Sequence, residues 1–496
     1  MRMPTDLYRP SLALLTDLYQ ITMAYAAWRS GWADREAVFH LFFRKNPFGG
    51  GFAVACGLEH AMDYLSRLRF DEEDLAYLGG LTGPGGARLF EKEFLNALRE
   101  MPMALDVDAI PEGTVVFRQE PLVRVRGPVI PCMLAETPLL NMINFQTLIA
   151  TKAARIVTAT RGEPVLDFGL RRAQGIDGAL TASRAAYIGG CAATSNVLAG
   201  RLLGIPVRGT HAHSWVMLFD TEREAFETYA RALPQNCVFL VDTYDTLEGV
   251  RNAIGVGSWL RENGHELFGV RLDSGDLAYL SIEARKLLDA AGFQKTHIFA
   301  TNDLDEYVIT SLKEQGSKIA VWGVGTRLAT AYDDPALGGV YKLAAVRRPG
   351  EKWNYRVKLS EQAVKTSTPG ILQVRRFAAG TEMIADAIFD EERGWPAGDY
   401  SIVDPFDITR QKRIKRDTGY TDLLVPVLRA GKPVYESPLL ATIRERALAQ
   451  LALLPSGVKR FLNPHQYPVG LEQSLFDLKT RLVLGARKPS STPRDT

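Results

Sequence analysis

The feature that most constrains the fold is a repeating pattern that begins at Val165. Short apolar runs that resemble buried strands recur from there onward, and most intervals between them carry apolar residues at helical spacing. Such alternation indicates a parallel sheet covered by helices, either open or closed into a barrel. The strand-like runs are Val165–Gly169, Pro206–Thr210, Val238–Asp242, Leu267–Leu272, His297–Ala300 and Ile319–Trp322, and the helical patterns are Ser183–Leu203, Leu247–Glu262, Leu277–Ala291 and Leu304–Gln315.

Each of these six strand-like runs ends in polar, charged or glycine residues. A barrel places the carboxyl ends of its strands around one mouth, where catalytic residues lie. We therefore expect the functional site at these ends. The six clusters are Asp-Phe-Gly-Leu-Arg, Gly-Thr-His-Ala-His, Asp-Thr-Tyr-Asp, Arg-Leu-Asp-Ser-Gly-Asp, Thr-Asn-Asp and Gly-Val-Gly-Thr.

The rest of the chain does not follow this pattern. Val107–Val129 alternates like antiparallel strands, and strand-like runs after Leu337 are predicted to rejoin it in a β domain. A chain of 496 residues is also too long for one ordinary core. We predict an N-terminal helical and β-sandwich domain (1–135), an α/β-barrel catalytic domain (136–335), a β segment that rejoins the N-terminal domain (336–430), a C-terminal helical segment (431–487) and a disordered tail (488–496).

Composition narrows the function classes. A net charge of +2 gives no sign of a nucleic-acid-binding surface, and no apolar run is long enough to cross a membrane or to act as a signal peptide. The four cysteines are far apart and form no CxxC or Cys/His metal pattern. These features predict a cytoplasmic enzyme with reduced, mostly buried cysteines.

The pair His211 and His213 allows more than one interpretation. Alternate residues at a strand end share a face, so the two imidazoles could bind a divalent metal in a barrel hydrolase. A single working histidine fits better, with Asp242 or Asp245 orienting its ring, and a purely structural histidine is the alternative. The metal interpretation lacks further ligands, because none of the later histidines stands at the carboxyl end of a predicted strand: His265, His297 and His465.

Other strand ends suit anions. Arg271 and Asp273 share a face, where arginine could bind an anion and aspartate could accept from ribose hydroxyls or hold Mg²⁺; an internal salt bridge is the alternative. Gly323–Thr326 offers backbone N–H groups and a hydroxyl to a phosphate. Phe168 with Arg171 or Arg172 could hold a flat aromatic acid by stacking and by an ion pair. Arg44 and Lys45, before three glycines, are predicted to form a mobile cationic loop.

Together these motifs resemble the nicotinate phosphoribosyltransferase family over most of the chain. The segments that carry the resemblance are Leu14–Tyr25, Phe43–Phe48, Asp167–Gly175, Ser195–Gly200, Gly209–Ser214, Val241–Asp245, Gly269–Asp276, Gly323–Thr326 and Asn463–Gly470.

The resemblance implies both a fold and a reaction. The fold is an irregular α/β barrel of the type II phosphoribosyltransferase kind, with an α+β sandwich-like domain and a C-terminal helical segment. The reaction converts nicotinate and phosphoribosyl pyrophosphate (PRPP) to nicotinate mononucleotide and pyrophosphate, the first step of NAD biosynthesis from nicotinate. It is coupled to ATP hydrolysis, with Mg²⁺ accompanying PRPP and ATP and no tightly bound metal or organic cofactor. A homodimer with shared active sites is also implied.

The resemblance assigns roles to individual residues by position. His213 is the histidine that ATP phosphorylates, with Asp242 supporting its ring, and His211 receives no role. Tyr19, which periodicity alone would place on a helix surface, reaches into the partner subunit's site and stacks on the base opposite Phe168. The nicotinate-binding residues are Tyr19, Phe168, Arg171, Thr210 and Arg271, with Arg271 also catalytic. The residues for PRPP and phosphate are Arg44, Lys45, Asp273, Ser274, Gly275, Asn302, Asp303, Gly325 and Thr326.

The choice of base can be argued from charge. The related nicotinamide enzyme has an aspartate at the position aligned with Ser195, where it would repel the carboxylate of nicotinate. Serine there favours nicotinate. The closest alternatives are a nicotinamide or quinolinate phosphoribosyltransferase; the more distant ones are the metal-dependent hydrolase using His211 and His213 and a non-catalytic nucleotide-binding protein.

Overall fold

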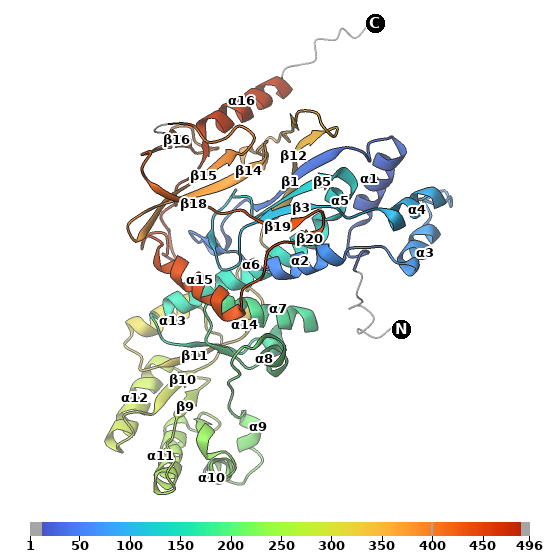
Figure 1. Cartoon of the computed structure of the whole chain (residues 1–496). Helices are drawn as coiled ribbons and strands as arrows, with labels where there is room; N and C mark the ends of the chain where they lie inside the picture. Colours follow the sequence, from blue (N-terminus) through green and yellow to red (C-terminus); the bar gives the residue numbers. More distant parts are fainter. Residues whose placement is uncertain (1–11, 398–399, 488–496) are drawn as a thin grey trace. The chain divides into compact units, whose positions relative to one another are not determined.

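The computed structural model describes residues 12–397 and 400–487, so the predicted tail lies outside the described residues. The chain divides into two compact units, which Figure 1 shows coloured along the sequence. The second unit comprises Leu148–Pro335 and Leu440–Leu448, and the first comprises the rest. The division falls inside helix α6 (Glu136–Ala159), whereas the predicted barrel segment began at the start of that helix. It also assigns most of α15 (Leu440–Ala452) to the second unit, and not to a separate C-terminal segment.

The second unit is built on a six-stranded sheet in which every paired strand is parallel. The strand order β7–β6–β11–β10–β9–β8 places the first predicted strand beside the last. The strands are β6 (Val165–Asp167), β7 (Ala193–Thr194), β8 (Val238–Leu240), β9 (Gly269–Leu272), β10 (His297–Ala300) and β11 (Val321–Val324).

Helices connect these strands, and acidic residues begin three of the helices. Asp245, Asp276 and Asp305 each accept hydrogen bonds from backbone N–H groups of the first turn, which is the usual role of an N-cap. The helices of the unit, apart from α6 and α15, are α7 (Gly175–Ile188), α8 (Val197–Leu203), α9 (His213–Val216), α10 (Glu222–Ala232), α11 (Thr246–Glu262), α12 (Leu277–Ala290), α13 (Glu306–Glu314) and α14 (Thr326–Ala329).

The region between β6 and β8 differs from the sequence prediction. The single helix expected over Ser183–Leu203 is two helices, α7 and α8, with strand β7 between them. Gly189 and Gly190 end the first helix, and the Asn196 side chain caps the second by accepting from the Ala199 N–H group. The strand expected at Pro206–Thr210 is reduced to one parallel bridge, between Thr194 and Val207. The barrel is therefore irregular on this side.

The first unit contains two larger sheets and a two-stranded one, β2 (Ala53–Val54) with β4 (Val115–Val116). The late strand β12 (Gly339–Arg347) pairs antiparallel with β1 (Glu36–Phe43), which confirms that the chain returns to the N-terminal β region. The seven-stranded sheet has the order β13–β12–β1–β5–β3–β19–β20, with β13 (Asn354–Tyr355), β5 (Val123–Pro128), β3 (Asp106–Ala109), β19 (Val425–Arg429) and β20 (Lys432–Pro433). The six-stranded sheet has the order β17–β16–β21–β15–β14–β18, with β17 (Gln411–Ile414), β16 (Tyr400–Val403), β21 (Val469–Glu472), β15 (Glu382–Asp390), β14 (Leu372–Ala379) and β18 (Gly419–Asp422).

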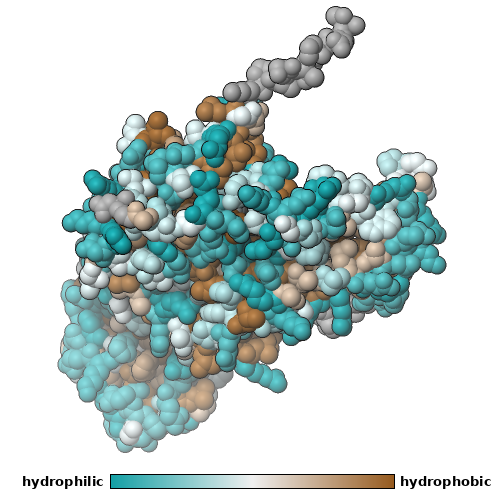
Figure 2. All heavy atoms as spheres, turned by 45° about the horizontal axis from the view of Figure 1, so that its top comes forward, coloured by the Kyte–Doolittle hydropathy of each residue, from teal (hydrophilic) through white to brown (hydrophobic). Residues whose placement is uncertain are grey.

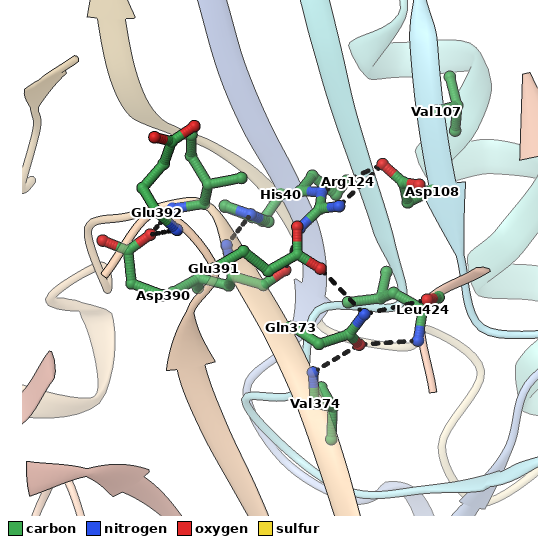
Figure 3. Close-up of polar contacts among 12 residues, drawn as sticks. His40, Val107, Asp108, Arg124, Gln373, Val374, Asp390, Glu391, Glu392 and Leu424 are labelled. Carbon is green, nitrogen blue, oxygen red and sulfur yellow. Dashed lines mark hydrogen bonds and ion pairs between the residues drawn. The ribbon is translucent and has the colours of Figure 1, made fainter. Parts of the chain in front are cut away.

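A buried polar network links these two sheets (Figure 3). Arg124 on β5 bonds to Asp108 and Glu391 and donates to the backbone oxygen of Leu372 on β14. The Leu372 N–H group donates to Nε2 of His40, so this buried imidazole is neutral. Burial, with a smaller effect from Arg124, lowers the pKa of His40 to about 3. Each buried charge of this network is paired, and the pairing offsets the free-energy cost of removing that charge from water.

Helices α1 (Leu18–Arg29), α2 (Leu58–Arg67), α3 (Glu72–Gly80), α4 (Lys92–Glu100), α5 (Val129–Leu134) and α16 (Gln473–Arg487) complete the first unit. Hydrophilic residues dominate the face shown in Figure 2, and hydrophobic ones form scattered groups. Within the described residues no helix is long and apolar enough to span a membrane. All four cysteines are free and buried, which confirms the expectation of buried side chains.

Candidate active site

A pocket of about 530 Å³ lies at the carboxyl ends of the barrel strands. It brings together residues from segments that are far apart in sequence, as the pattern of polar strand ends predicted. The predicted site residues that line it are Phe168, Arg171, Thr210, His213, Arg271, Asp273, Asn302, Asp303, Gly325 and Thr326, together with Ser195. Arg172, His211 and Thr301 line it as well.

Phe168 is positioned by the turn that follows β6. Its N–H group donates to the Val324 carbonyl at 2.8 Å, and the buried Asp167 carboxylate accepts from the Gly169 N–H group at 2.9 Å. A side chain at Gly323 would come within 2.8 Å of the Phe168 ring, so glycine is required there for the ring to pack. The aromatic face is thus fixed, while Arg171 and Arg172, in the following turn, are exposed.

Arg271 extends from β9 into the same pocket. Its guanidinium bonds to the Thr210 hydroxyl and donates to the His211 carbonyl at 2.8 Å. Burial lowers the pKa of Arg271, and the neighbouring charges of Asp273, Asp242 and Arg171 act on it more weakly. Arginine remains charged under any physiological condition. The pocket therefore contains a partly desolvated cation that is oriented by its neighbours.

His211 has a structural role. The ring is buried among aromatic side chains, its Nε2 atom accepts from the Leu240 N–H group at 3.3 Å, and its carbonyl contacts Arg271. Burial lowers the pKa of His211 to about 4, so the imidazole is neutral at physiological pH. Because Nε2 of His211 already accepts a hydrogen bond, this nitrogen is not available to a metal ion shared with His213. Within the described residues no group of three or more His, Cys, Asp or Glu side chains could hold a metal ion.

His213 lies at the start of α9 and contacts two residues of the pocket region. Its Nδ1 atom is 3.1 Å from the Thr243 hydroxyl, and its Nε2 atom is 3.7 Å from a carboxylate oxygen of Asp273. The predicted contact with Asp242 or Asp245 is absent from these interactions. Asp242 accepts from the Asp273 N–H group at 2.9 Å and from the Ser274 hydroxyl at 2.6 Å, and Asp245 caps α11. Thr243 was missed because a threonine between two aspartates gives no distinct sequence signal.

The end of the pocket that is predicted to bind phosphate is formed by two loops. Asn302 and Asp303 follow β10, and Asn302 has a positive φ of 119°, an uncommon conformation that costs on the order of 1–3 kcal/mol and is typical of functional sites. Gly325 and Thr326 follow β11. The two loops are joined by an ion pair that sequence reasoning missed, Arg327 to Asp305 at 2.6 Å.

Asp273 is held by the Thr301 hydroxyl on one oxygen and faces His213 with the other. Ser274 and Gly275 do not line the pocket; Ser274 bonds to Asp242 instead, and Gly275 has a positive φ of 76° before α12. These two residues support the loop that carries Asp273. Their predicted contact with PRPP stays a prediction.

Three predicted site residues belong to the first unit. Tyr19 is 47 % exposed on α1, and Lys45 is exposed after β1. The loop with Arg44 and Lys45 has a defined conformation, because Pro47 and Phe48 are buried and Asn46 accepts from the Arg118 N–H group at 3.0 Å. The expected mobility of this loop stays a prediction.

The arrangement can bind an anionic aromatic acid and a polyphosphate together. Guanidinium groups and an aromatic ring line this pocket, and so do the carboxylates of Asp273 and Asp303, together with glycines and hydroxyl-bearing residues suited to ribose and phosphate. An irregular α/β barrel with such a site defines the type II phosphoribosyltransferase class. The crystal structure of nicotinate-nucleotide pyrophosphorylase from Pyrococcus furiosus has the same fold, with a TM-score of 0.65 over 91 % of this chain and 97 % of that one, at 21 % identity.

Comparison with known proteins identifies the family within that class. Three profiles match: the nicotinate phosphoribosyltransferase N-terminal domain at residues 14–144, the family profile at 164–358 and the C-terminal domain at 373–479. Nicotinate phosphoribosyltransferase of Bacillus subtilis is 42 % identical over 489 residues, covering 95 % of each chain. The human enzyme is 36 % identical over 541 residues, covering 95 % of this chain and 97 % of its own. The crystal structure of the human protein superimposes with a TM-score of 0.82, covering 94 % of this chain and 99 % of that one, at 34 % identity. The chain belongs to the nicotinate phosphoribosyltransferase family and is an enzyme.

Proposed function

We propose that this enzyme joins nicotinate to the phosphoribosyl group of PRPP, which yields nicotinate mononucleotide and pyrophosphate in the first step of NAD biosynthesis from nicotinate. The observation that carries the proposal is the pairing of Phe168 with the oriented Arg271 in one pocket. The ring supplies a stacking face, and the guanidinium supplies a partner for a carboxylate. Family membership supports the same reaction.

Chemistry at the ribose requires stabilisation of charge more than proton transfer. The bond from C1 to pyrophosphate breaks through an oxocarbenium-like state, so cations must stabilise the departing group. The carboxylates of Asp273 and Asp303 would hold the Mg²⁺ ions that accompany PRPP, and Gly325 and Thr326 would bind the 5′-phosphate. The ring nitrogen of nicotinate attacks without a general base, and Phe168, Arg171 and Arg271 only need to place it.

ATP coupling is proposed to run through His213. Its Nε2 atom points toward Asp273, so a phosphoryl group on the ring would lie near the ribose and pyrophosphate end of the pocket. The added negative charge could order cationic residues such as Arg44 and Lys45 and tighten PRPP binding. His213→Ala should remove stimulation by ATP while a slow ATP-independent reaction persists; undiminished stimulation in that variant would contradict this step.

A homodimer with shared active sites is proposed from the family resemblance, and exposed apolar side chains support it. Helices α1 and α8 each expose apolar side chains that an isolated subunit would leave in water. On α1 and just before it these are Leu15, Leu18, Tyr19 and Met23, and on α8 they are Val197, Leu198 and Leu202.

The choice of nicotinate over nicotinamide or quinolinate is tested with all three bases. Ser195 lines the pocket and presents no negative charge to a carboxylate. We expect kcat/KM to be highest with nicotinate, and Ser195→Asp to lower it by about 10- to 100-fold through like-charge repulsion. Ser195→Ala is the matched control and should change it little. If the unaltered enzyme has a higher kcat/KM with nicotinamide or quinolinate than with nicotinate, nicotinate is not its preferred base.

A further inference from the structure

His213 has one hydroxyl neighbour, Thr243, whose position is well defined. The Nδ1 atom of the ring and Oγ1 of Thr243 are 3.1 Å apart, within hydrogen-bond range. The other ring nitrogen, Nε2, is on the side of Asp273, 3.7 Å from its carboxylate. One nitrogen is thus occupied by the protein and the other faces the pocket.

Thr243 is held by the elements on both sides of it. Before it, the buried Val241 donates its N–H group to the Arg271 carbonyl at 3.1 Å. After it, Asp245 caps α11 by accepting from the Glu248 N–H group at 2.8 Å. A β-branched side chain on such a constrained segment loses little further freedom when it makes one hydrogen bond.

Asp242, the residue expected to orient the histidine, makes its hydrogen bonds elsewhere. One of its oxygens accepts from both the Asp273 N–H group and the Ser274 hydroxyl. The other oxygen is buried and has no hydrogen-bond partner among the described residues. Asp242 therefore supports the loop of Asp273, and ring orientation is left to Thr243.

We propose that Thr243 is the positioning residue for His213: its hydroxyl oxygen accepts a hydrogen bond from the Nδ1 proton, which leaves Nε2 as the atom that reacts. This assignment rests on the proposed ATP coupling. With the proton on Nδ1 donated to the Thr243 oxygen, the lone pair is on Nε2. That pair forms the bond to the γ-phosphorus of ATP while the bond from that phosphorus to the bridging oxygen breaks, and its electron pair leaves with ADP. The Nδ1 proton stays on the ring throughout.

The test compares three variants by two readouts: transfer of label from γ-labelled ATP to the protein, and the ratio of turnover with and without ATP. Thr243→Val keeps the shape of the side chain but loses the hydroxyl, and should slow labelling about 10- to 100-fold and lower the ratio toward that of His213→Ala. Thr243→Ser restores the hydroxyl and should recover labelling to within a few-fold. Asp242→Asn should raise the KM for PRPP more than it slows labelling.

Tyr244→Phe is the matched control, since its exposed side chain lies next to Thr243 and should leave both readouts unchanged. If Thr243→Val is labelled at the unaltered rate, or if Thr243→Ser fails to recover labelling, the role assigned to Thr243 is wrong. Neither result contradicts the proposed function. An unaltered enzyme that forms nicotinate mononucleotide but takes up no label contradicts the phosphorylation of His213, and the assignment with it. No turnover of nicotinate and PRPP at all contradicts the proposed function instead.

Discussion

Arg171 and Arg271 line the same pocket with very different freedom. Arg271 is held by Thr210 and by the His211 carbonyl, whereas Arg171 is exposed and makes no ion pair within the described part of the chain. A fixed guanidinium can orient a ligand, and a free one can close on it after binding. At the scale of single residues, nicotinate would thus be recognised by two arginines. Arg271 is already held in position, and Arg171 would move onto the ligand after it has bound.

Arg171→Ala should raise the KM for nicotinate by about 10-fold or more and change the KM for PRPP much less, because the lost ion pair is to the carboxylate of the base. Steady-state kinetics with each substrate varied in turn measures this. Arg172→Ala is the comparison, since Arg172 lines the pocket one residue further along the turn. Equal effects of Arg171→Ala on both KM values would exclude the carboxylate role.

Glu120 in the first unit gives a prediction about stability. Burial, and next the Asp386 carboxylate, raise the pKa of Glu120 well above its ordinary value. A raised pKa in the folded state contributes stability below the unfolded value of about 4.5, and that contribution is lost as pH rises. Glu120→Gln, which needs no proton, should gain stability relative to the unaltered protein as pH rises from 5 to 7, by up to about 3 kcal/mol.

Urea unfolding of both proteins at several pH values measures this difference. Glu93→Gln, an exposed change on α4, is the control and should give no pH-dependent gain. A constant difference between Glu120→Gln and the unaltered protein across this range would show that Glu120 is ionised in the folded state.

At the scale of elements, the ion pair from Arg327 to Asp305 ties the start of α14 to the start of α13. Asp305 is 2 % exposed and also caps α13 through the Tyr307 and Val308 N–H groups. Gly325 directly before α14 and Asp303 three residues before α13 line the end of the pocket that is predicted to bind phosphate. The pair therefore sets the spacing of the two loops that would bind the phosphoribosyl group.

Arg327→Leu should raise the KM for PRPP by about 10-fold and that for nicotinate much less, and Arg327→Lys should recover part of the loss by restoring the charge. The kinetic comparison uses Arg251→Leu as its control, because Arg251 pairs with Glu248 on an exposed face of α11. Loss of affinity for both substrates together would indicate a general loss of structure.

The strand ends show how much of the site the sequence predicts. Six apolar runs predicted the barrel and placed Phe168, Arg271 and Asp273 in one pocket, because parallel strands must end together. Periodicity missed β7, since a two-residue strand between helices has no pattern of its own. It also missed the contact of Thr243 with His213, because a hydrogen-bond partner across two segments depends on the packed geometry.

At the scale of the whole molecule, the proposed homodimer has two subunits that share each active site. Tyr19 is on an exposed part of α1, and periodicity alone predicted only a surface position for it. No single-chain pattern can reveal a residue that acts in a partner, which is why this role came only from family resemblance. Complementation between two variants that each lack ATP-stimulated activity at low nicotinate can test it.

If Tyr19 acts in the partner's site, a mixed dimer of Tyr19→Ala and His213→Ala subunits has one intact site, formed by the Tyr19→Ala barrel and the Tyr19 of the other subunit. Equal mixing after dissociation should then restore about a quarter of the normal ATP-stimulated activity at low nicotinate, because half the dimers are mixed. The two variants kept separate are the control. Activity that stays at the mean of the two variants would place Tyr19 in the site of its own subunit, or in none.

The most direct test of the central claim is pyrophosphate release from PRPP by the purified enzyme, measured with nicotinate, with nicotinamide and with no base. The account predicts release that requires nicotinate, matches the nicotinate mononucleotide formed, and is faster when ATP is added. Release that is independent of nicotinate, or PRPP binding without any release, would contradict it.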